Sequence, residues 1–581
     1  MVTVSVLLLL VALLVASLAR NTAGADVVRN AGPKTTHPGK PLARTSEGPV
    51  RGFVENGVNT FLGIPYASPP VGGLRWQPPQ RPARRRKPLA ATEYGPPCPQ
   101  VTTFGVFAGP TSVEEDCLKL NVFTPRLRPD RSGRPVLVWI HGGGNVTGAS
   151  KDYDGSKLAQ GGRYGGSDTV VVTVNYRLGL LGFLAHPALD GEGDPAVNYG
   201  LLDIQAALRW VQRNIAAFGG DPDRITLGGQ SAGASDTGAN LISPLSAGLF
   251  DRAILQSPNA SETSLMSTFP PLSRALTRGR GFAEAAGCPG ENADTAACLR
   301  AMSVPEILQL QGTVNANGPY VTGPTVDGTV IPVTPERAWT SGRFNQVPVM
   351  GGNTKDERTF FSGITEYFSG PPQEPMSAQD YIDGITRTYS GNAGPGGTPP
   401  AYPPGTVERV LAEYPLSNYA TPQLADNAAF TDATACRSRH VHNLLSERVP
   451  LYAYQFDYRD APYYFPPMPG FVPLAAHTID IQFLFPLWHG GNLGVPHPLN
   501  TEETRLSDQL VAAWTNFARS GNPNGAGDPP WPRHVSDTGP YLSQNLPSSS
   551  TFTDAQFSAS HHCAFWDEIL IYEGSPADGG Q

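Results

Sequence analysis

The strongest constraint on the fold is an alternation between short β-branched runs and longer segments of helical periodicity. Buried strands are expected at Val136–Ile140, Thr169–Val174 and Ile225–Leu227. Between the last two, apolar residues recur every three or four positions from Leu201 to Ile215, as on one face of a helix. This alternation predicts an α/β fold with a mostly parallel central sheet flanked by helices.

Two further strands are expected at Val347–Met350 and Leu451–Phe456, so the alternation extends into the second half of the chain. The chain has 581 residues, 40% hydrophobic and 16% charged, which indicates a globular protein with a large core. Its formal net charge of −8 would repel phosphate backbones and anionic lipids, so no nucleic-acid partner is expected.

The N-terminus predicts a secretory signal peptide over residues 1–25. An apolar run from Val4 to Leu18 precedes Ala23-Gly24-Ala25, a pattern of small residues that signal peptidases cut. The run is shorter than the roughly 20 residues of a spanning helix, so no stable membrane insertion is expected. We expect a secreted protein whose six cysteines form disulfides, with a pairing that spacing alone leaves open. No cysteine and histidine spacing predicts a metal site.

Gly229-Gln230-Ser231-Ala232-Gly233 matches the G-x-S-x-G pattern in which a serine is exposed on a sharp turn between a strand and a helix. Such a match is weak alone in a chain with 64 glycines. Here it follows the strand expected at Ile225–Leu227 and precedes a segment of small residues that can begin a helix. Ser231 is therefore the candidate nucleophile, at the positive end of a helix dipole.

A second motif, His141-Gly142-Gly143-Gly144, directly follows the strand that ends at Ile140. Its bare backbone predicts an oxyanion hole formed by the N–H groups of Gly143, Gly144 and Ala232. A serine hydroxyl also needs a base and an acid that orients the base, and in this architecture the histidine follows the serine in the chain. Composition does not choose among the histidines beyond Ser231, which are His440, His442, His477, His489, His497, His534, His561 and His562.

Four other segments, in order along the chain, carry a resemblance to a known family. They are Phe61–Ala67, Pro69–Gly72, Glu115–Val122 and Phe218–Pro222. With the two motifs above, they resemble the type-B carboxylesterases, which include cholinesterases and many microbial esterases and lipases. The resemblance covers nearly the whole mature chain and implies an α/β-hydrolase fold.

The resemblance also implies the partners of Ser231. Glu357 ends a segment similar to the one that carries the family's acid, and Arg358 follows where glycine is usual. His477 opens a segment similar to the family's histidine loop, which makes it the base. In that loop Thr478 stands where glycine is common, and Asp480 stands where an acidic residue is usual. Histidines such as His440, His442 and His489 then have structural roles.

The family's disulfide pattern pairs all six cysteines: Cys98 with Cys117, Cys288 with Cys298, and Cys436 with Cys563. The last pair would tie a mid-chain segment to the C-terminal end, so residues 26–581 are expected to form a single domain. The Gly- and Pro-rich stretch 390–405 is then a surface loop on that domain. By the same resemblance Arg177 and Asp203 form a buried structural ion pair.

The function expected is hydrolysis of small-molecule or lipid carboxylic esters through an acyl-enzyme, without a cofactor or metal. The choline-specific branch is disfavoured, because the loop from Cys98 to Cys117 contains no tryptophan for a quaternary ammonium, and Gln230 replaces the usual Glu. A microbial carboxylesterase is favoured. A triacylglycerol lipase is the alternative, and a non-catalytic adhesion or scaffold member is disfavoured by the intact triad. The oligomeric state and the use of the sequons at Asn145 and Asn259 stay open.

Overall fold

The computed structural model describes residues 40–101, 111–127, 133–162, 164–189, 197–258, 269–315, 323–390, 402–464, 466–486, 497–527 and 529–570. The chain divides into two compact units, Met1–Lys40 and Pro41–Gln581, and the fold below is that of the second. The predicted signal peptide, His489, the Asn259 sequon and most of the loop 390–405 lie outside the described residues.

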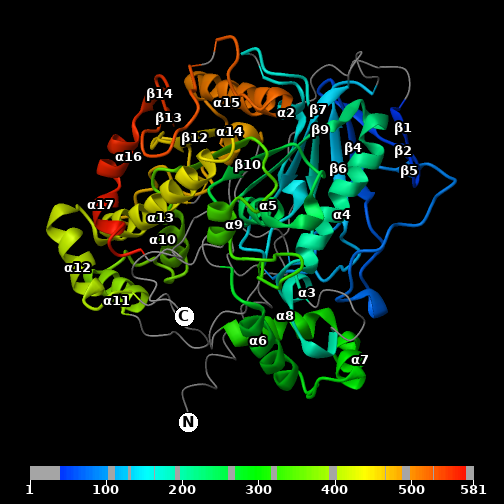
Figure 1. Ribbon diagram of the computed structural model, residues 1–581, viewed down its shortest axis with the longest axis horizontal. Coiled ribbons are helices and arrows are strands. Elements are labelled where there is room, and N and C mark those ends of the chain that lie inside the picture. The colour runs from blue at the N-terminus through cyan, green and yellow to red at the C-terminus, as the bar shows by residue number, and fades with distance from the viewer. Residues whose placement is uncertain are drawn as a thin grey trace. The chain divides into compact units, whose positions relative to one another are not determined.

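A sheet of eleven described strands forms the centre of the second unit (Figure 1). Its strands are β3 (Phe53–Glu55), β4 (Val58–Pro65), β6 (Lys119–Thr124), β7 (Arg134–Ile140), β8 (Val170–Val174), β9 (Gly220–Gln230), β10 (Arg252–Gln256), β11 (Val349–Thr354), β12 (Leu451–Phe456), β13 (Tyr541–Gln544) and β14 (Ser550–Phe552). Their order is β14-β13-β12-β11-β10-β9-β7-β8-β6-β4-β3. The pairs from β13 to β8 are parallel, and those at both ends are antiparallel. A small second sheet contains β1 (Leu42–Thr45), β2 (Gly48–Arg51) and β5 (Leu89–Ala90).

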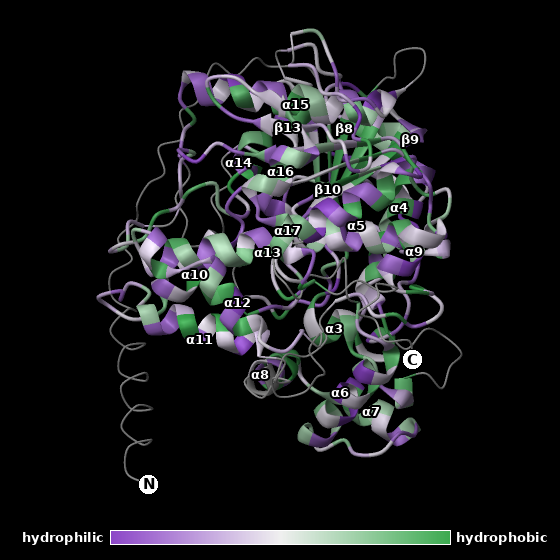
Figure 2. Cartoon of the chain, turned by 60° about the vertical axis from the view of Figure 1, so that its left-hand side comes forward, coloured by the Kyte–Doolittle hydropathy of each residue, from purple (hydrophilic) through white to green (hydrophobic). Residues whose placement is uncertain are grey.

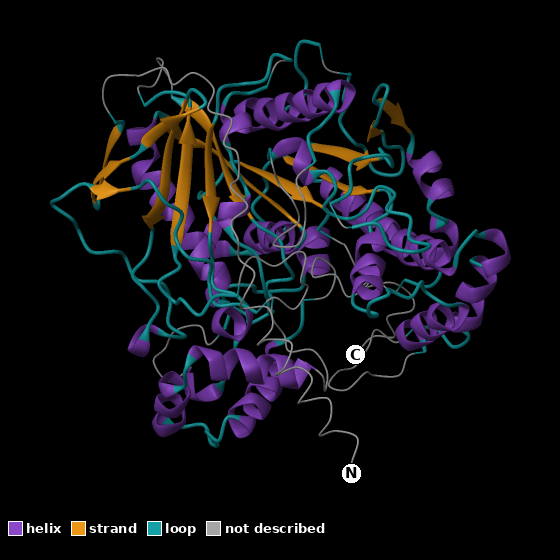
Figure 3. Ribbon diagram, turned by 180° about the vertical axis from the view of Figure 1, so that it is seen from behind, coloured by secondary structure: helices purple, strands orange, loops and turns teal. Residues whose placement is uncertain are grey.

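Helices surround the sheet, as Figure 3 shows from behind. The described α-helices are α2 (Ser156–Ala159), α3 (Gly179–Phe183), α4 (Tyr199–Asn214), α5 (Ala232–Ile242), α6 (Leu272–Ala285), α7 (Ala293–Ala301), α8 (Val304–Asn315), α9 (Pro335–Ser341), α10 (Arg358–Tyr367), α11 (Ala378–Tyr389), α12 (Thr406–Glu413), α13 (Pro422–Ser446), α14 (Ile481–Leu484), α15 (Thr501–Ser520), α16 (Asp554–Ser560) and α17 (Cys563–Trp566). Short 3-10 helices are η2 (Gly72–Leu74), η3 (Ser150–Asp152), η4 (Pro187–Leu189), η5 (Ile215–Phe218), η6 (Pro244–Ser246) and η7 (Leu416–Asn418). No helix among the described residues has the length and apolar character needed to span a bilayer.

The central strands are apolar throughout because both of their faces are covered. In β7, Val136 and Val138 join the core cluster that contains residues of α4 and α5, whereas Leu137 and Trp139 join the cluster that contains residues of α2 and α15. Successive side chains of a strand point to opposite faces, so these helices form two layers over one sheet. Figure 2 shows the hydrophobic residues concentrated in these central strands.

The predicted α/β architecture and the predicted central strands are confirmed, with shifted ends. β12 has the predicted bounds, while β9 begins at Gly220, five residues before the predicted strand. The strand predicted at Val347–Met350 is displaced to Val349–Thr354. Pro348 has no N–H to donate to a ladder, so regular pairing begins at the next residue, where Val349 N–H donates to the Pro450 carbonyl.

The helices around α13 were not predicted from the sequence. α13 packs against α10, α11 and α17, beside one another in Figure 1. The side of α13 toward the protein carries small and polar buried residues, including Ala425, Asp426, Thr431 and Asp432. Because those residues lack apolar periodicity, no helix was predicted there.

Candidate active site

Ser231 lies on the sharp turn between β9 and α5, with φ 58° and ψ −125°. The two glycines of the motif are required by close backbone packing. A Cβ at Gly229 would lie 2.4 Å from the Gly233 carbonyl oxygen, and one at Gly233 would lie 2.2 Å from the Ile140 carbonyl oxygen. The turn leaves Ser231 partly exposed, while every residue of α5 behind it is buried. This placement presents the hydroxyl at the N-terminal end of a helix.

Glu357 and His477 meet in the interior, although 120 residues separate them. Glu357 follows β11 and directly precedes α10, and His477 lies in the loop before α14. His477 Nδ1 hydrogen-bonds to Glu357 Oε2, and both side chains are almost completely buried. Glu357 Oε1 accepts from Thr354 N–H at 2.9 Å and from Asn353 Nδ2 at 3.0 Å.

These contacts keep Glu357 ionised. Burial by itself raises the pKa of a carboxyl group, because it disfavours the charged form. Here the adjacent His477 and the hydrogen bond from Thr354 N–H outweigh burial and leave the pKa of Glu357 below its usual value. A carboxylate in this position can orient the imidazole and stabilise it when it gains a proton.

The second nitrogen of His477 faces the serine turn. Its Nε2 lies 3.2 Å from Nε2 of Gln230, the residue directly before Ser231. The ring is flanked by Phe360 and Phe361 of α10, with centroid separations of 5.4 and 5.5 Å. These aromatic neighbours fix the ring plane and exclude water from one side of it.

The glycine motif after β7 packs directly against the same turn. A Cβ at Gly142 would lie 2.9 Å from the Gln230 carbonyl oxygen and 3.0 Å from Ser231 Cβ. Gly143 and Gly144 have φ values of 112° and 61°, which favour glycine. Within the described chain, the N–H groups of Gly143, Gly144 and Ala232 donate to no protein acceptor. They are free to bind an oxyanion.

Gln100 holds the far end of this loop, a role that was not predicted from the sequence. Its Oε1 accepts from the Thr147 hydroxyl at 2.6 Å and from Gly148 N–H at 2.9 Å. Its Nε2 donates to the carbonyls of Gly148, at 2.9 Å, and Cys98, at 3.1 Å. A lone glutamine near a cysteine is an ordinary sequence feature, so only the tertiary structure identifies it as a support of the glycine loop.

The comparison with known protein families agrees with this geometry. The carboxylesterase family matches residues 39–566, which is most of the chain. The chain belongs to the carboxylesterase family. It therefore has the α/β-hydrolase fold and is a carboxylic ester hydrolase that acts on small-molecule esters.

Several relatives match over most of their length. Acetylcholinesterase from Bungarus fasciatus is 32% identical over 560 residues, which cover 90% of this chain and 86% of the relative. Fumonisin B1 esterase from Sphingopyxis macrogoltabida is 34% identical over 514 residues, covering 85% and 84%. Carboxylesterase 3 from Homo sapiens is 35% identical over 523 residues, covering 85% of both chains. The expected placement in a microbial branch stays a prediction.

Two departures from the usual carboxylesterase pattern have local explanations. Arg358 begins α10, and its Nε donates to Asp426 of α13 at 2.8 Å while its guanidinium lies 4.3 Å from the Phe430 ring centroid. The arginine thus ties the segment after Glu357 to α13. Thr478 has φ 75°, a left-handed conformation that favours glycine and so explains why glycine is common at this position. Its hydroxyl forms a hydrogen bond with the Tyr464 hydroxyl.

The other polar residues singled out from the sequence have structural roles or support the site. Arg177 and Asp203 form the predicted buried ion pair, at 2.7 Å. His440 pairs with Glu336, and His442 is buried, which lowers its pKa to about 3. Asp480 lies close enough to Glu357 for burial and that charge to raise its pKa to about 7. Among the described residues, no cluster of His, Cys, Asp or Glu is suited to hold a metal ion.

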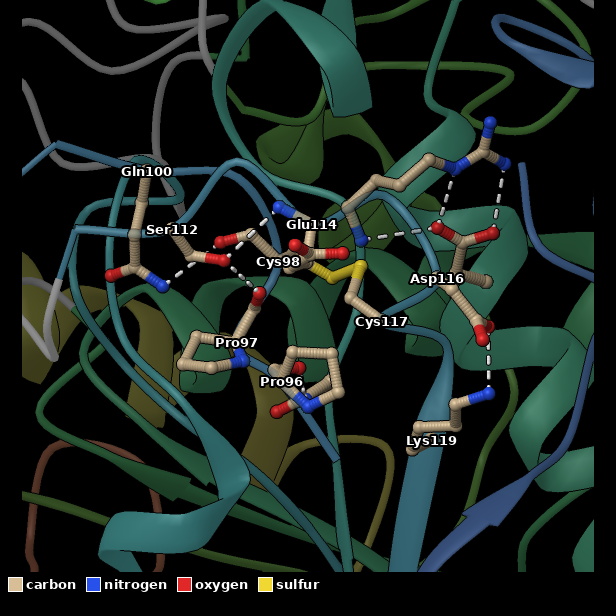
Figure 4. The surroundings of a disulfide bond; sticks show 12 residues. Pro96, Pro97, Cys98, Gln100, Ser112, Glu114, Asp116, Cys117 and Lys119 are labelled. Carbon is tan, nitrogen blue, oxygen red and sulfur yellow. Dashed lines mark hydrogen bonds and ion pairs between the residues drawn. A yellow bond between two sulfur atoms is a disulfide. The ribbon is translucent and has the colours of Figure 1, made fainter. Parts of the chain in front are cut away.

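The structure contains the three disulfides that the resemblance implied, Cys98–Cys117, Cys288–Cys298 and Cys436–Cys563. Figure 4 shows the first of them, with Gln100 beside it and an ion pair between Lys119 and Asp116 at 2.6 Å. Three disulfides suggest a protein outside the reducing cytosol.

Proposed function

We propose that this carboxylesterase works through a Ser231–His477–Glu357 triad. Ser231 Oγ attacks the ester carbonyl carbon while His477 Nε2 takes its proton, and Glu357 stabilises the imidazolium. The C–O bond to the alcohol then breaks as His477 returns the proton to the leaving oxygen. Water attacks the acyl-enzyme by the same route, releasing the acid and restoring Ser231.

The N–H groups of Gly143, Gly144 and Ala232 are the proposed donors to the oxyanion. Such donors act because they are already oriented where negative charge develops, and removing one of them raises the barrier by about 3 kcal/mol. The observation that carries the proposal is the buried Glu357–His477 pair, whose second ring nitrogen lies 3.2 Å from Nε2 of Gln230, the residue before Ser231.

Covalent labelling tests the nucleophile. A fluorophosphonate probe should label folded protein once, on the peptide that contains Ser231, and Ser231→Ala should lose labelling together with about 10⁴-fold or more in kcat on p-nitrophenyl esters. Ser243→Ala, at the opposite end of α5, should keep both. Labelling at another residue, or full activity in Ser231→Ala, refutes the triad and leaves the non-catalytic alternative.

The substrate class is proposed to be small soluble esters rather than triacylglycerols. Relatives over most of the chain include a fumonisin B1 esterase and a cocaine esterase by name. Initial rates should be highest on p-nitrophenyl esters with short acyl chains and should fall as the chain lengthens. The rate on emulsified triacylglycerol should be lower than the rate on the short esters. Faster turnover of the emulsion would support the lipase alternative.

We further propose that the protein is secreted after cleavage behind Ala25. The apolar run from Val4 to Leu18 supports this, and so do the three disulfides. N-terminal sequencing of protein from the culture medium should begin at Asp26. A retained leader, or protein found only inside the cells, contradicts the proposal.

A further inference from the structure

Asn145, which follows the glycine loop, is completely buried and engaged in contacts. Its φ of 58° is left-handed, a conformation that asparagine tolerates, and its backbone carbonyl accepts from Gly179 N–H at 2.6 Å. Its Nδ2 donates to Asp236 at 3.2 Å, and its Oδ1 accepts from the Tyr176 hydroxyl at 3.0 Å. A glycan on this sequon is incompatible with the structure.

Asp236 is a completely buried carboxyl group on α5, five positions after Ser231. The nearby Tyr176 hydroxyl lies 3.0 Å from both the His141 carbonyl oxygen and Asn145 Oδ1, and it can donate its proton to only one of them at a time. Asp236 Oδ1 accepts from Asn145 Nδ2, whereas Asp236 Oδ2 is buried and has no hydrogen-bond partner among the described residues. A proton on Asp236 Oδ2 removes the negative charge that burial disfavours there.

Among the described residues, no positively charged side chain acts on this carboxyl group. α5 packs against β7, β9, β10, α4 and α9, and the titratable side chain that acts on Asp236 from the described residues is Tyr176. Tyr176 in turn lies near Tyr153 and is stacked on His141 at 4.7 Å. Burial lowers the pKa of His141 to about 4, so its ring is neutral near pH 7. An isolated buried carboxylate is strongly disfavoured.

We propose that Asp236, in its protonated form, is a positioning residue that holds the oxyanion loop through Tyr176 and Asn145. The two contacts reach both ends of the loop, the carbonyl of His141 and the side chain of Asn145. Loss of the proton places a buried negative charge beside Asn145, which directly follows the glycines of the loop. The inference rests on the proposed function, since it assigns a role to the same loop.

The titration of Asp236 sets the expected pH dependence. Burial raises its pKa to about 8, while the hydrogen bonds from Asn145 and Tyr176 act in the opposite direction. Because the pKa is raised in the folded state, this contribution to stability is greatest at low pH, falls as pH rises above the ordinary value of 3.8, and is lost once pH passes about 8. The wild type should therefore lose stability between about pH 4 and 8, whereas its kcat should fall as Asp236 loses its proton near pH 8.

The test compares pH profiles of wild type and Asp236→Asn, whose amide keeps a donor at every pH. Wild-type kcat should fall about fivefold or more between pH 7.5 and 9.5, with KM nearly unchanged. Asp236→Asn should stay within about twofold over this range, and its thermal midpoint should rise relative to wild type as pH increases. Identical alkaline limbs in the two proteins would overturn the inference.

Two controls separate position from general effects. Asp251→Asn changes a carboxyl that also has a raised pKa but directly precedes β10, at the other end of the strands from Ser231. This variant should therefore show the same fall in kcat at alkaline pH as the wild type. If Asp236→Asn does not fold, Tyr176→Phe tests the same connection and should flatten the limb at a lower kcat. A wild-type limb in Tyr176→Phe would count against the inference.

Fluorophosphonate labelling of the wild type at pH 7 distinguishes the two proposals. Labelling at Ser231 combined with identical alkaline limbs in wild type and Asp236→Asn removes only the role of Asp236. Failure to label Ser231 removes the triad, and the positioning role falls with it.

Discussion

At the residue scale, two buried acids of the site, Glu357 and Asp480, differ in ionisation because their partners differ. Glu357 accepts hydrogen bonds from His477, Thr354 and Asn353, and its pKa is lowered. Asp480 has one side-chain donor, Gln256 at 2.8 Å, and its pKa is raised to about 7 by burial and by the charge of Glu357. Environment therefore assigns a charged role to one acid and a mostly neutral one to the other.

Replacement of each acid by its amide tests this difference. Glu357→Gln should lower kcat by about 10³ to 10⁴, because an amide cannot stabilise the imidazolium, while its Oε1 can still accept from Thr354 and Asn353. Asp480→Asn, the matched control, should cost about tenfold or less at pH 6, where the native carboxyl is mostly protonated. Comparable losses in the two variants would contradict the assigned roles.

At the scale of elements, close approach between helix and loop decides where glycine is required. In α6 a Cβ at Gly279 would lie 1.7 Å from the Ala185 carbonyl oxygen, whereas a Cβ at Gly281 would have no atom within 4 Å. The two positions share the same helix and a similar intrinsic propensity. Only contact with the segment around Ala185, which follows α3, distinguishes them.

This pair gives a prediction for stability. Gly279→Ala should lower the free energy of unfolding by about 2 kcal/mol or more, because the helix must move away from Ala185. Gly281→Ala should raise it by up to about 1 kcal/mol, since alanine favours a helix and limits the unfolded chain. Urea unfolding of both variants provides the measurement, and equal effects would show that α6 does not pack as described.

At the scale of the whole molecule, the sheet and the disulfides connect distant parts of the chain. The sheet pairs strands from Phe53 to Phe552. Cys436–Cys563 spans 127 residues and joins α13 to α17, whereas Cys288–Cys298 spans 10. A cross-link restricts the unfolded chain more when the loop that it closes is longer.

The two disulfides should therefore differ in their contribution to stability. Replacement of Cys436 and Cys563 by alanine should lower the free energy of unfolding by about 5 kcal/mol, and replacement of Cys288 and Cys298 by about 2.5 kcal/mol. Urea unfolding midpoints of the two double variants, measured under oxidising conditions, test this order. A larger loss for the shorter loop would contradict the expectation.

Local patterns in the sequence determined the architecture and the chemical groups of the site. The strands β7 and β8 could be predicted because both faces of the central sheet are buried, which makes their sequences apolar throughout. The turn at Ser231 could be predicted because it has no room for a Cβ at the two flanking glycines, so the motif requires glycine there. The proposed acid and histidine came from resemblance to a family, since eight histidines follow Ser231 and nothing local separates them.

Only the tertiary structure decided what surrounds those groups. Gln100 and Tyr176 contact the glycine loop from separate segments, Asp236 contacts Asn145 next to it, and α13 buries small and polar residues that carry no periodic signal. Burial and hydrogen-bond partners are produced by contacts between residues far apart in the chain, and pKa values depend on both. The sequence therefore determined which groups are present, whereas packing decided which of them are charged and which are held in place.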